Sequence, residues 1–159
     1  MNSKDYNHSV ALYSGRLLRF VRKLLKDDDS AADVSQNCFM RLWENLDKVE
    51  VDKAKSWLFT VAYRESLQLI AKKKQKTDLS ALDSLSYESP MPDLKDVIER
   101  CLVQLPEIQR SVLMLRDYEG YDYIEIGKIL ELKESQVKVY LFRARQKMKE
   151  QIKDLNLVI

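Results

Sequence analysis

The stretch that most narrows the choice of fold reads YDYIEIGKILELKESQVKVYLFR and occupies residues 121–143. Apolar residues recur at three- and four-residue spacing on either side of a short polar break. This pattern predicts a short helix over 123–130, a three-residue turn and a longer helix from Glu134, the succession typical of a helix-turn-helix. Gly127 lies inside the first helix, where glycine costs about 1 kcal/mol relative to alanine. We expect glycine there because the second helix approaches closely at the crossing.

The second of these helices separates into two faces at about 100° per residue. The inward stripe consists of Val137, Leu141, Ala144 and Met148, while Ser135, Val139, Phe142, Arg143 and Gln146 point away. An outward aromatic residue between two cations suits contact with a thymine methyl or a sugar, while the arginine bonds guanine or phosphate. The candidate DNA-binding set is Ser135, Gln136, Lys138, Val139, Phe142, Arg143 and Gln146. The alternative is an ordinary helical hairpin with a solvated basic face and a half-buried Phe142.

The composition of the whole chain favours an all-helical protein. Its 159 residues and 18.7 kDa allow one domain or two small ones and exclude large multidomain enzymes. Only 3 glycines and 3 prolines occur, against 45% hydrophobic and 33% charged residues, a balance that favours helices over turns. The formal net charge of +2 says little about partners, because basic and acidic residues are segregated along the chain.

Periodicity predicts helices on both sides of an irregular segment. Before it, the pattern indicates helices over 12–26, 31–46 and 54–76, with Ser30 opening the second of them through a capping box. After it come 94–105 and a helix over 107–119 that begins at Pro106. Residues 77–93 combine serines, acids and two prolines without helical period. We therefore expect two small helical domains, 1–76 and 94–159, joined by a flexible acidic linker over 77–93.

The sequence offers no candidate for catalysis, a metal or another cofactor. Cys38 and Cys101 are far apart with only His8 as a further soft ligand, so we expect two reduced core cysteines and no zinc site. The acids Asp27, Asp28, Asp29 and Asp33 are adequately explained as charges at a helix entrance. No signal peptide and no apolar run of about 18 residues occurs, so we expect a cytoplasmic protein without membrane insertion.

Two further motifs frame the helix-turn-helix. Near the N-terminus, ADVSQNCFMRLW at residues 32–43 is followed by WLFTVA at residues 57–62, and near the C-terminus LPE at 105–107 precedes YEGY at 118–121 and VKVYLFRAR at 137–145. In this order they resemble regions two and four of the extracytoplasmic-function (ECF) subfamily of bacterial RNA polymerase sigma factors. The resemblance covers almost the whole chain.

The resemblance implies functions for both domains. Region four reads the minus-35 promoter element, and region two holds the polymerase clamp helices and opens the minus-10 element. On the second helix, residues spaced by three and four form a free face for core polymerase, comprising Asp33, Gln36, Asn37, Met40, Arg41 and Trp43. On the third, aromatic and basic residues suit capture of displaced single-stranded bases, and the minus-10 candidates are Tyr63, Arg64, Gln68, Lys72, Lys73 and Lys74. Packing in the core is the alternative for the aromatic residues of this helix, Trp57, Phe59 and Tyr63.

The chain departs from the family pattern at several positions. Where many members carry arginine then asparagine after the tryptophan-leucine motif, this chain has Tyr63 and Arg64, and Gln68 and Ala71 replace aspartate and arginine. At the turn of the helix-turn-helix, where glycine is usual, it has Glu131, and Gln136 replaces a common threonine. We expect these departures to change promoter melting and base preference and to leave the fold intact.

Taken together, the sequence predicts a non-enzymatic sigma factor that binds core RNA polymerase and directs initiation from promoter DNA, with an anti-sigma factor as a further partner. A free-standing helix-turn-helix regulator is the main alternative, but it leaves the N-terminal motif without a function and favours a dimer. A metal-dependent nuclease lacks a second acidic cluster. A helical adaptor without nucleic-acid contact predicts no salt-sensitive affinity for DNA.

Overall fold

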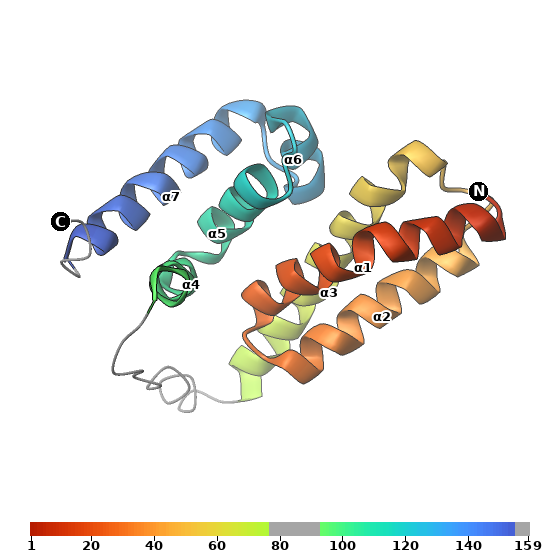
Figure 1. The fold of residues 1–159 in the computed structure, drawn as a ribbon, viewed down its shortest axis with the longest axis horizontal. Coiled ribbons are helices and arrows are strands. Elements are labelled where there is room, and N and C mark those ends of the chain that lie inside the picture. The colour runs from red at the N-terminus through yellow and green to blue at the C-terminus, as the bar shows by residue number, and fades with distance from the viewer. Residues whose placement is uncertain (77–92, 155–159) are drawn as a thin grey trace.

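The computed structural model describes residues 1–76 and 93–154, and their regular structure is helical throughout (Figure 1). The N-terminal unit, residues 1–76, contains α1 (Ser3–Leu25), α2 (Asp28–Glu44), the short 3-10 helix η1 (Val51–Lys53) and α3 (Ala54–Lys76). The C-terminal unit, residues 93–154, contains α4 (Leu94–Gln104), α5 (Glu107–Leu113), the π-helical turn η2 (Met114–Tyr118), α6 (Tyr123–Leu130) and α7 (Glu134–Asp154). Residues 77–92 of the expected linker lie outside the described residues.

The N-terminal unit is a bundle in which α1, α2 and α3 lie side by side (Figure 1). Each helix contributes large apolar side chains to the centre, among them Phe20, Leu42, Leu58 and Phe59, all fully buried. The start of α1 is fixed by a capping box between Asn2 and Asp5. Burial of this apolar face is the main contribution to stability, because helix propensity alone rarely sustains helices in water.

Two helix starts in this unit differ from the sequence expectation. Helix α1 begins at Ser3, well before the predicted residue 12. Helix α2 begins at Asp28 because Asp27 is its N-cap, accepting hydrogen bonds from the Asp29 amide at 3.2 Å and the Ser30 hydroxyl at 2.6 Å. The prediction that Ser30 opens this helix is therefore wrong: an acceptor three residues earlier satisfies the free amides.

The helix-turn-helix of the C-terminal unit consists of α6 and α7. Asp122 and Glu125 form a capping box at the start of α6, and Glu131 ends it in the left-handed conformation with φ 59° and ψ 48°. Gly127 is required by close approach of the turn, not of the second helix as the sequence predicts. The tightest contact of an added Cβ would be the Leu132 carbonyl oxygen of the turn at 2.6 Å, with a side-chain carbon of Val137 at 3.9 Å.

The helix predicted over 107–119 is divided by the π-helical turn. Helix α5 begins at Glu107, after Pro106 at the N-cap, and from Met114 the chain widens so that the Glu119 amide donates to the Met114 carbonyl at 3.0 Å. The turn adds one residue per helical repeat and so changes the direction in which the following side chains point. Asp117 of the turn pairs with Arg145 of α7, whereas Glu119, directly after the turn, pairs with Arg19 of α1.

The two units pack directly on each other and share a continuous core. Helix α3 contacts α6, and α1 contacts α4 and α5. At the centre of the interface the rings of Phe59 and Tyr121 meet edge to face with centroids 5.7 Å apart. None of the described helices is long and apolar enough to cross a membrane.

Candidate nucleic-acid and partner interfaces

Helix α7 presents the two faces that its periodicity predicts. Val137, Leu141 and Ala144 are buried, and Met148 is half-buried. The seven candidate DNA-binding residues are all exposed, from Ser135 to Gln146. The Phe142 side chain is 68% exposed, so the alternative of a half-buried Phe142 is wrong for this arrangement.

Three features position α7: the turn before it, a cap at its start and an ion pair to the π-helical turn. The close approach of Gly127 to Leu132 sets the turn. The Gln136 side-chain oxygen accepts from the Lys133 amide at 2.9 Å, so this DNA-binding candidate also caps the helix, a role that sequence reasoning missed. Arg145 forms a two-pronged ion pair with Asp117 of the π-helical turn, with Nη2 to Oδ1 at 2.6 Å and Nε to Oδ2 at 3.3 Å.

The outward face of α7 combines cations with aromatic rings. Lys138 Nζ lies 5.6 Å from the centroid of the Tyr123 ring and 3.6 Å from a Glu134 carboxylate oxygen. A hollow of about 320 Å³ runs beside this ring, and Lys138, Phe142 and Lys149 are among the residues that line it. Cations beside apolar surface can bind phosphates and base edges together.

Some of the minus-10 candidates are exposed, whereas others are buried or paired with another side chain. Gln68, Lys72, Lys73 and Lys74 are exposed on the C-terminal half of α3, although Lys73 Nζ lies 3.3 Å from an Asp27 carboxylate oxygen. Tyr63 is only 7% exposed. Burial raises the pKa of its phenol to about 12, with Glu107 and Glu131 adding to the shift.

Tyr63 lies on α3, which packs against α6 of the C-terminal unit, and its ring belongs to the core that the two units share. Its ring is covered in this arrangement, and its stacking on a displaced base stays a prediction. Arg64 is exposed but binds Glu131, with Nη2 to Oε1 at 2.9 Å. Both residues face the C-terminal unit rather than solvent alone.

The polymerase-binding candidates form one exposed face of α2. Asp33, Gln36, Asn37 and Arg41 are exposed. Met40 and Trp43 are large apolar residues that remain 55% and 51% exposed. Such exposed apolar side chains among polar neighbours are typical of a protein-binding surface. Phe39 and Leu42 are buried on the opposite side, as the spacing predicts.

Neighbouring side chains orient two residues of this α2 face. The Trp43 ring packs edge to face on Tyr6, with centroids 5.0 Å apart. Arg41 Nε lies 3.1 Å from a Glu65 carboxylate oxygen of α3. The face is therefore held in a fixed shape by α1 and α3.

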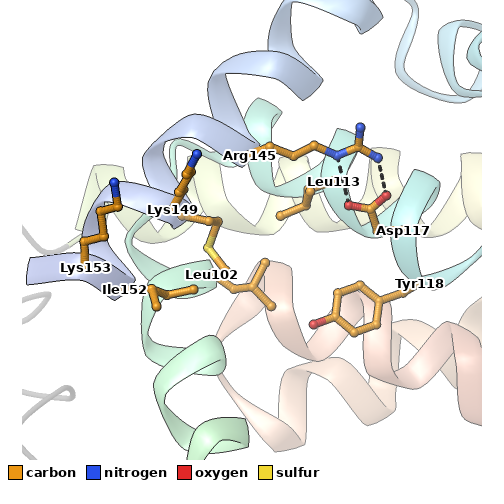
Figure 2. A pocket seen from close by; sticks show the side chains of 9 residues that line it. Leu102, Leu113, Asp117, Tyr118, Arg145, Lys149, Ile152 and Lys153 are labelled. Atoms are coloured by element: carbon orange, nitrogen blue, oxygen red, sulfur yellow. Dashed lines mark hydrogen bonds and ion pairs between the residues drawn. The ribbon is translucent and has the colours of Figure 1, made fainter. Parts of the chain in front are cut away.

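An apolar groove that sequence reasoning missed lies between α4, the π-helical turn and α7 (Figure 2). It has a volume of about 490 Å³. Its floor is apolar and its edge carries the Asp117–Arg145 ion pair and two lysines from α7. The lining residues are Leu102, Leu113, Asp117, Tyr118, Arg145, Met148, Lys149, Ile152 and Lys153. They come from distant segments, so no local pattern could reveal them.

Metal-ligating side chains do not gather in groups of three or more within the described part of the chain. Cys38 is fully buried, and burial raises the pKa of its thiol to about 12, which keeps it in the unreactive protonated form. Burial also raises the pKa of Cys101. Both cysteines therefore pack as small apolar residues.

Comparison with known proteins agrees with this arrangement. Residues 10–76 match the family model described as sigma-70 region 2, and residues 95–148 match the model described as sigma-70, region 4. The chain is 30% identical over 145 residues to the ECF RNA polymerase sigma factor SigM of Bacillus subtilis, covering 87% of this chain and 89% of SigM. It is 23% identical over 172 residues to the ECF RNA polymerase sigma-E factor of Escherichia coli, covering 97% and 90%.

Solved structures show the same fold. The sigma factor RpoE in complex with the anti-sigma factor NepR from Bartonella quintana superposes with a TM-score of 0.78 at 25% identity, covering 94% of this chain and 98% of RpoE. CnrH in complex with the cytosolic domain of CnrY superposes with a TM-score of 0.70 at 19% identity, covering 96% and 90%.

Proposed function

The chain belongs to the ECF family of RNA polymerase sigma factors, and from this membership we propose how its surfaces divide the work of transcription initiation. As a member it is a non-enzymatic factor that binds RNA polymerase and DNA and directs initiation through sigma regions 2 and 4. A free-standing regulator acting without polymerase is excluded, because it gives no role to region 2. The residue assignments that follow are proposals.

Region 4 reads the minus-35 element with the outward face of α7. The exposed Phe142 beside Arg143 is the observation that carries this assignment. An aromatic side chain that is mostly exposed on a basic helix has no packing role, but it can contact a thymine methyl while arginine bonds guanine. Residues 94–159 are the proposed region-4 domain, and residues 77–93 link it to region 2.

Region 2, residues 1–76, binds core polymerase and opens the minus-10 element. The exposed face of α2 from Asp33 to Trp43 is the proposed polymerase contact. On α3, the exposed side chains of Gln68, Lys72 and Lys74 are the proposed contacts to the displaced strand, together with Lys73, whose Nζ also lies 3.3 Å from an Asp27 carboxylate oxygen. Opening needs no catalytic group in this chain, since capture of unstacked bases shifts the equilibrium by roughly 1–3 kcal/mol per base.

An anti-sigma factor is a proposed further partner. RpoE, the structural relative at 25% identity, is in complex with one. The apolar groove of Figure 2 gives region 4 of this chain an exposed apolar surface with a basic edge, suited to an amphipathic helix with acidic flanks. A cytoplasmic location is part of the same proposal, because the polymerase and the promoter lie there.

Run-off transcription from a promoter library, with core polymerase in the presence and absence of this chain, tests the proposed function. We expect new start sites that depend on the chain. The matched control is the Arg143→Ala variant, which should keep polymerase association and lose promoter selection. An absence of stimulated initiation at every promoter and salt concentration would refute the proposal.

A further inference from the structure

The side chain of Gln136, near the start of α7, is held by the backbone on one side. Helix α7 begins at Glu134, and Gln136 Oε1 accepts a hydrogen bond from the Lys133 amide at 2.9 Å. A backbone amide can only donate, so the side-chain atom that faces it must be the oxygen. A glutamine that bonds back to the residue before the helix forms half of a capping box. The cap therefore fixes the orientation of the Gln136 amide group.

The end of this amide group that the cap leaves for DNA is the NH2 group. A glutamine side chain carries one acceptor oxygen and two N–H donors, and the cap uses the oxygen. Gln136 is exposed, and helix-turn-helix proteins contact base edges with the first residues of their second helix. A bidentate contact needs the oxygen and the nitrogen to face the base together, whereas here the oxygen faces the helix backbone. Gln136 therefore presents donors to a base.

Donors alone fit guanine better than any other base. In the major groove guanine presents two neighbouring acceptors, N7 and O6, whereas adenine presents an acceptor beside a donor, thymine an acceptor beside a methyl group, and cytosine a donor. A glutamine with both amide atoms available pairs with adenine, because its oxygen and nitrogen match the donor and the acceptor of that base. With the Gln136 oxygen held by the Lys133 amide, this match to adenine is lost.

The charges around Gln136 also favour a base edge rich in acceptors. Lys133 and Lys138 are exposed on either side of it in the sequence, and the acceptors N7 and O6 attract such cations. Glu134 would repel the same edge, but its carboxylate oxygen lies 3.6 Å from Lys138 Nζ, which offsets its charge. Arg143 lies on the same face seven positions further on, about 10 Å along the helix axis, so it should contact a different base pair.

We propose that Gln136 is a specificity-determining residue of the minus-35 interface and selects guanine, because its cap leaves only donors for the base. The inference rests on the proposed function, since it requires the outward face of α7 to enter promoter DNA. The same side chain starts the helix and chooses the base. A substitution that keeps the cap and changes the exposed end from donor to acceptor should therefore change the preferred base without moving the helix.

The decisive variant is Gln136→Glu. Glutamate keeps an oxygen for the Lys133 amide and is favourable in the first turn of a helix, so thermal stability should be kept or raised. Its second oxygen accepts where the parent donates, so the preferred base should become cytosine, whose N4 amino group is a donor. Gln136→Met removes both the cap and the donors. Gln146→Glu is the matched control for charge, because it adds the same charge to the exposed face of α7 away from the cap.

The experiment takes a promoter found by run-off transcription, randomises its minus-35 element and selects duplexes with core polymerase carrying the full chain or a variant. We expect guanine at one base pair with the parent, roughly tenfold over adenine, and cytosine at the same position of the same strand with Gln136→Glu. Gln136→Met should show no preference there, and Gln146→Glu should weaken binding overall and keep guanine. Hydrogen exchange of the Lys133 amide should be slow in the parent and in Gln136→Glu, and faster in Gln136→Met.

A preference for adenine in the parent that Gln136→Glu abolishes would overturn the inference, because both amide atoms would then read the base. The same base preference in the parent and in Gln136→Glu, or equally fast exchange of the Lys133 amide in the parent and in Gln136→Met, would also overturn it. Each of these results leaves the proposed function standing, since a promoter is still selected. If run-off transcription finds no promoter that depends on the chain, the proposed function fails and this inference fails with it.

Discussion

Asp117 and Arg145 join the π-helical turn to helix α7 through two hydrogen bonds, at 2.6 Å and 3.3 Å. The hydrogen bond to Asp117 raises the pKa of the Arg145 guanidinium above its usual value. Two residues later, Glu119 points to α1 instead. The π-helical turn thus directs one acid to the DNA-binding helix and the other to the neighbouring unit.

Replacing Asp117 with asparagine should loosen α7. Both side chains are partly exposed, so we expect the free energy of unfolding to fall by about 0.5–1 kcal/mol at low salt, with a smaller loss at high salt. Chemical denaturation at two salt concentrations measures this. Glu134→Gln, which removes the exposed pair with Lys138 within α7, should lose less. An equal fall in the free energy of unfolding in both variants would show that the Asp117–Arg145 pair contributes no more than an ordinary surface pair.

Replacing Arg143 with alanine should weaken binding to minus-35 duplex DNA by about 1–3 kcal/mol, because a guanine contact or a phosphate contact is lost. Fluorescence anisotropy with the full chain and a promoter duplex measures the affinity. Lys95→Ala on α4 removes the same charge from an exposed position and should have a much smaller effect. Equal weakening in both variants would indicate a response to net charge alone.

Replacing Met40 with alanine should reduce association with core polymerase. Met40 is exposed on the α2 face, so truncation removes apolar contact area in the complex, roughly 1–2 kcal/mol, without creating a cavity in the free protein. Pull-down with core polymerase and thermal unfolding separate the two effects. Leu12→Ala on α1, which is also about half exposed, is the matched control. Unchanged association for Met40→Ala would exclude this residue from the contact.

Replacing Lys72 and Lys74 together with alanine should slow strand opening more than closed-complex formation. Both lysines are exposed on α3, where they can attract the phosphates of the separated strand. Permanganate reactivity of unpaired thymines measures opening, and electrophoretic mobility measures the closed complex. Equal defects in both steps would assign these lysines to duplex binding.

Replacing Tyr121 with phenylalanine should reduce the sensitivity of the protein to alkali. The hydroxyl of Tyr121 is buried without a hydrogen-bond partner, so its removal should leave the free energy of unfolding at pH 7 unchanged or higher. Burial raises the pKa of the Tyr121 phenol above its ordinary value, and Glu119 and Glu125 add to the shift.

Ionisation of the Tyr121 phenol is linked to folding, so the stability of the protein depends on pH. Because the native state holds the neutral phenol while the unfolded chain ionises near pH 10, stability falls as the pH rises above about 10. The variant should show a smaller fall in thermal unfolding between pH 9 and pH 11. Tyr140→Phe, at a half-buried position on α7, is the control. A fall equal to that of the parent would contradict the argument.

Local patterns predicted most of the helices and both faces of α7. The predicted helix over 123–130 coincides with α6, and α3 begins and ends at the predicted residues. Errors occurred where a side chain or a carbonyl outside the periodic pattern decided a boundary. Asp27 caps α2 three residues before Ser30, and the π-helical turn divides the helix that begins at Glu107.

The candidate residues on exposed helix faces could also be predicted from the sequence, because hydrophobic periodicity and charge identify the outward face of a helix. The exposure of Phe142 and Met40 follows from this. Tyr63 could not be placed in the same way. Its neighbours are apolar on more than one side, and whether its ring faces solvent depends on the C-terminal unit that covers it.

The amino-acid sequence alone determined the helical class, the helix-turn-helix, the family and the outward stripe of α7, since each depends on residues within a few turns of one another. Only the tertiary structure decided that Glu119 meets Arg19, that Glu131 meets Arg64 and that an apolar groove opens beside Tyr118. The physical reason is that helix crossings and the π-helical turn set which side chains meet across large sequence separations, and no local period records them.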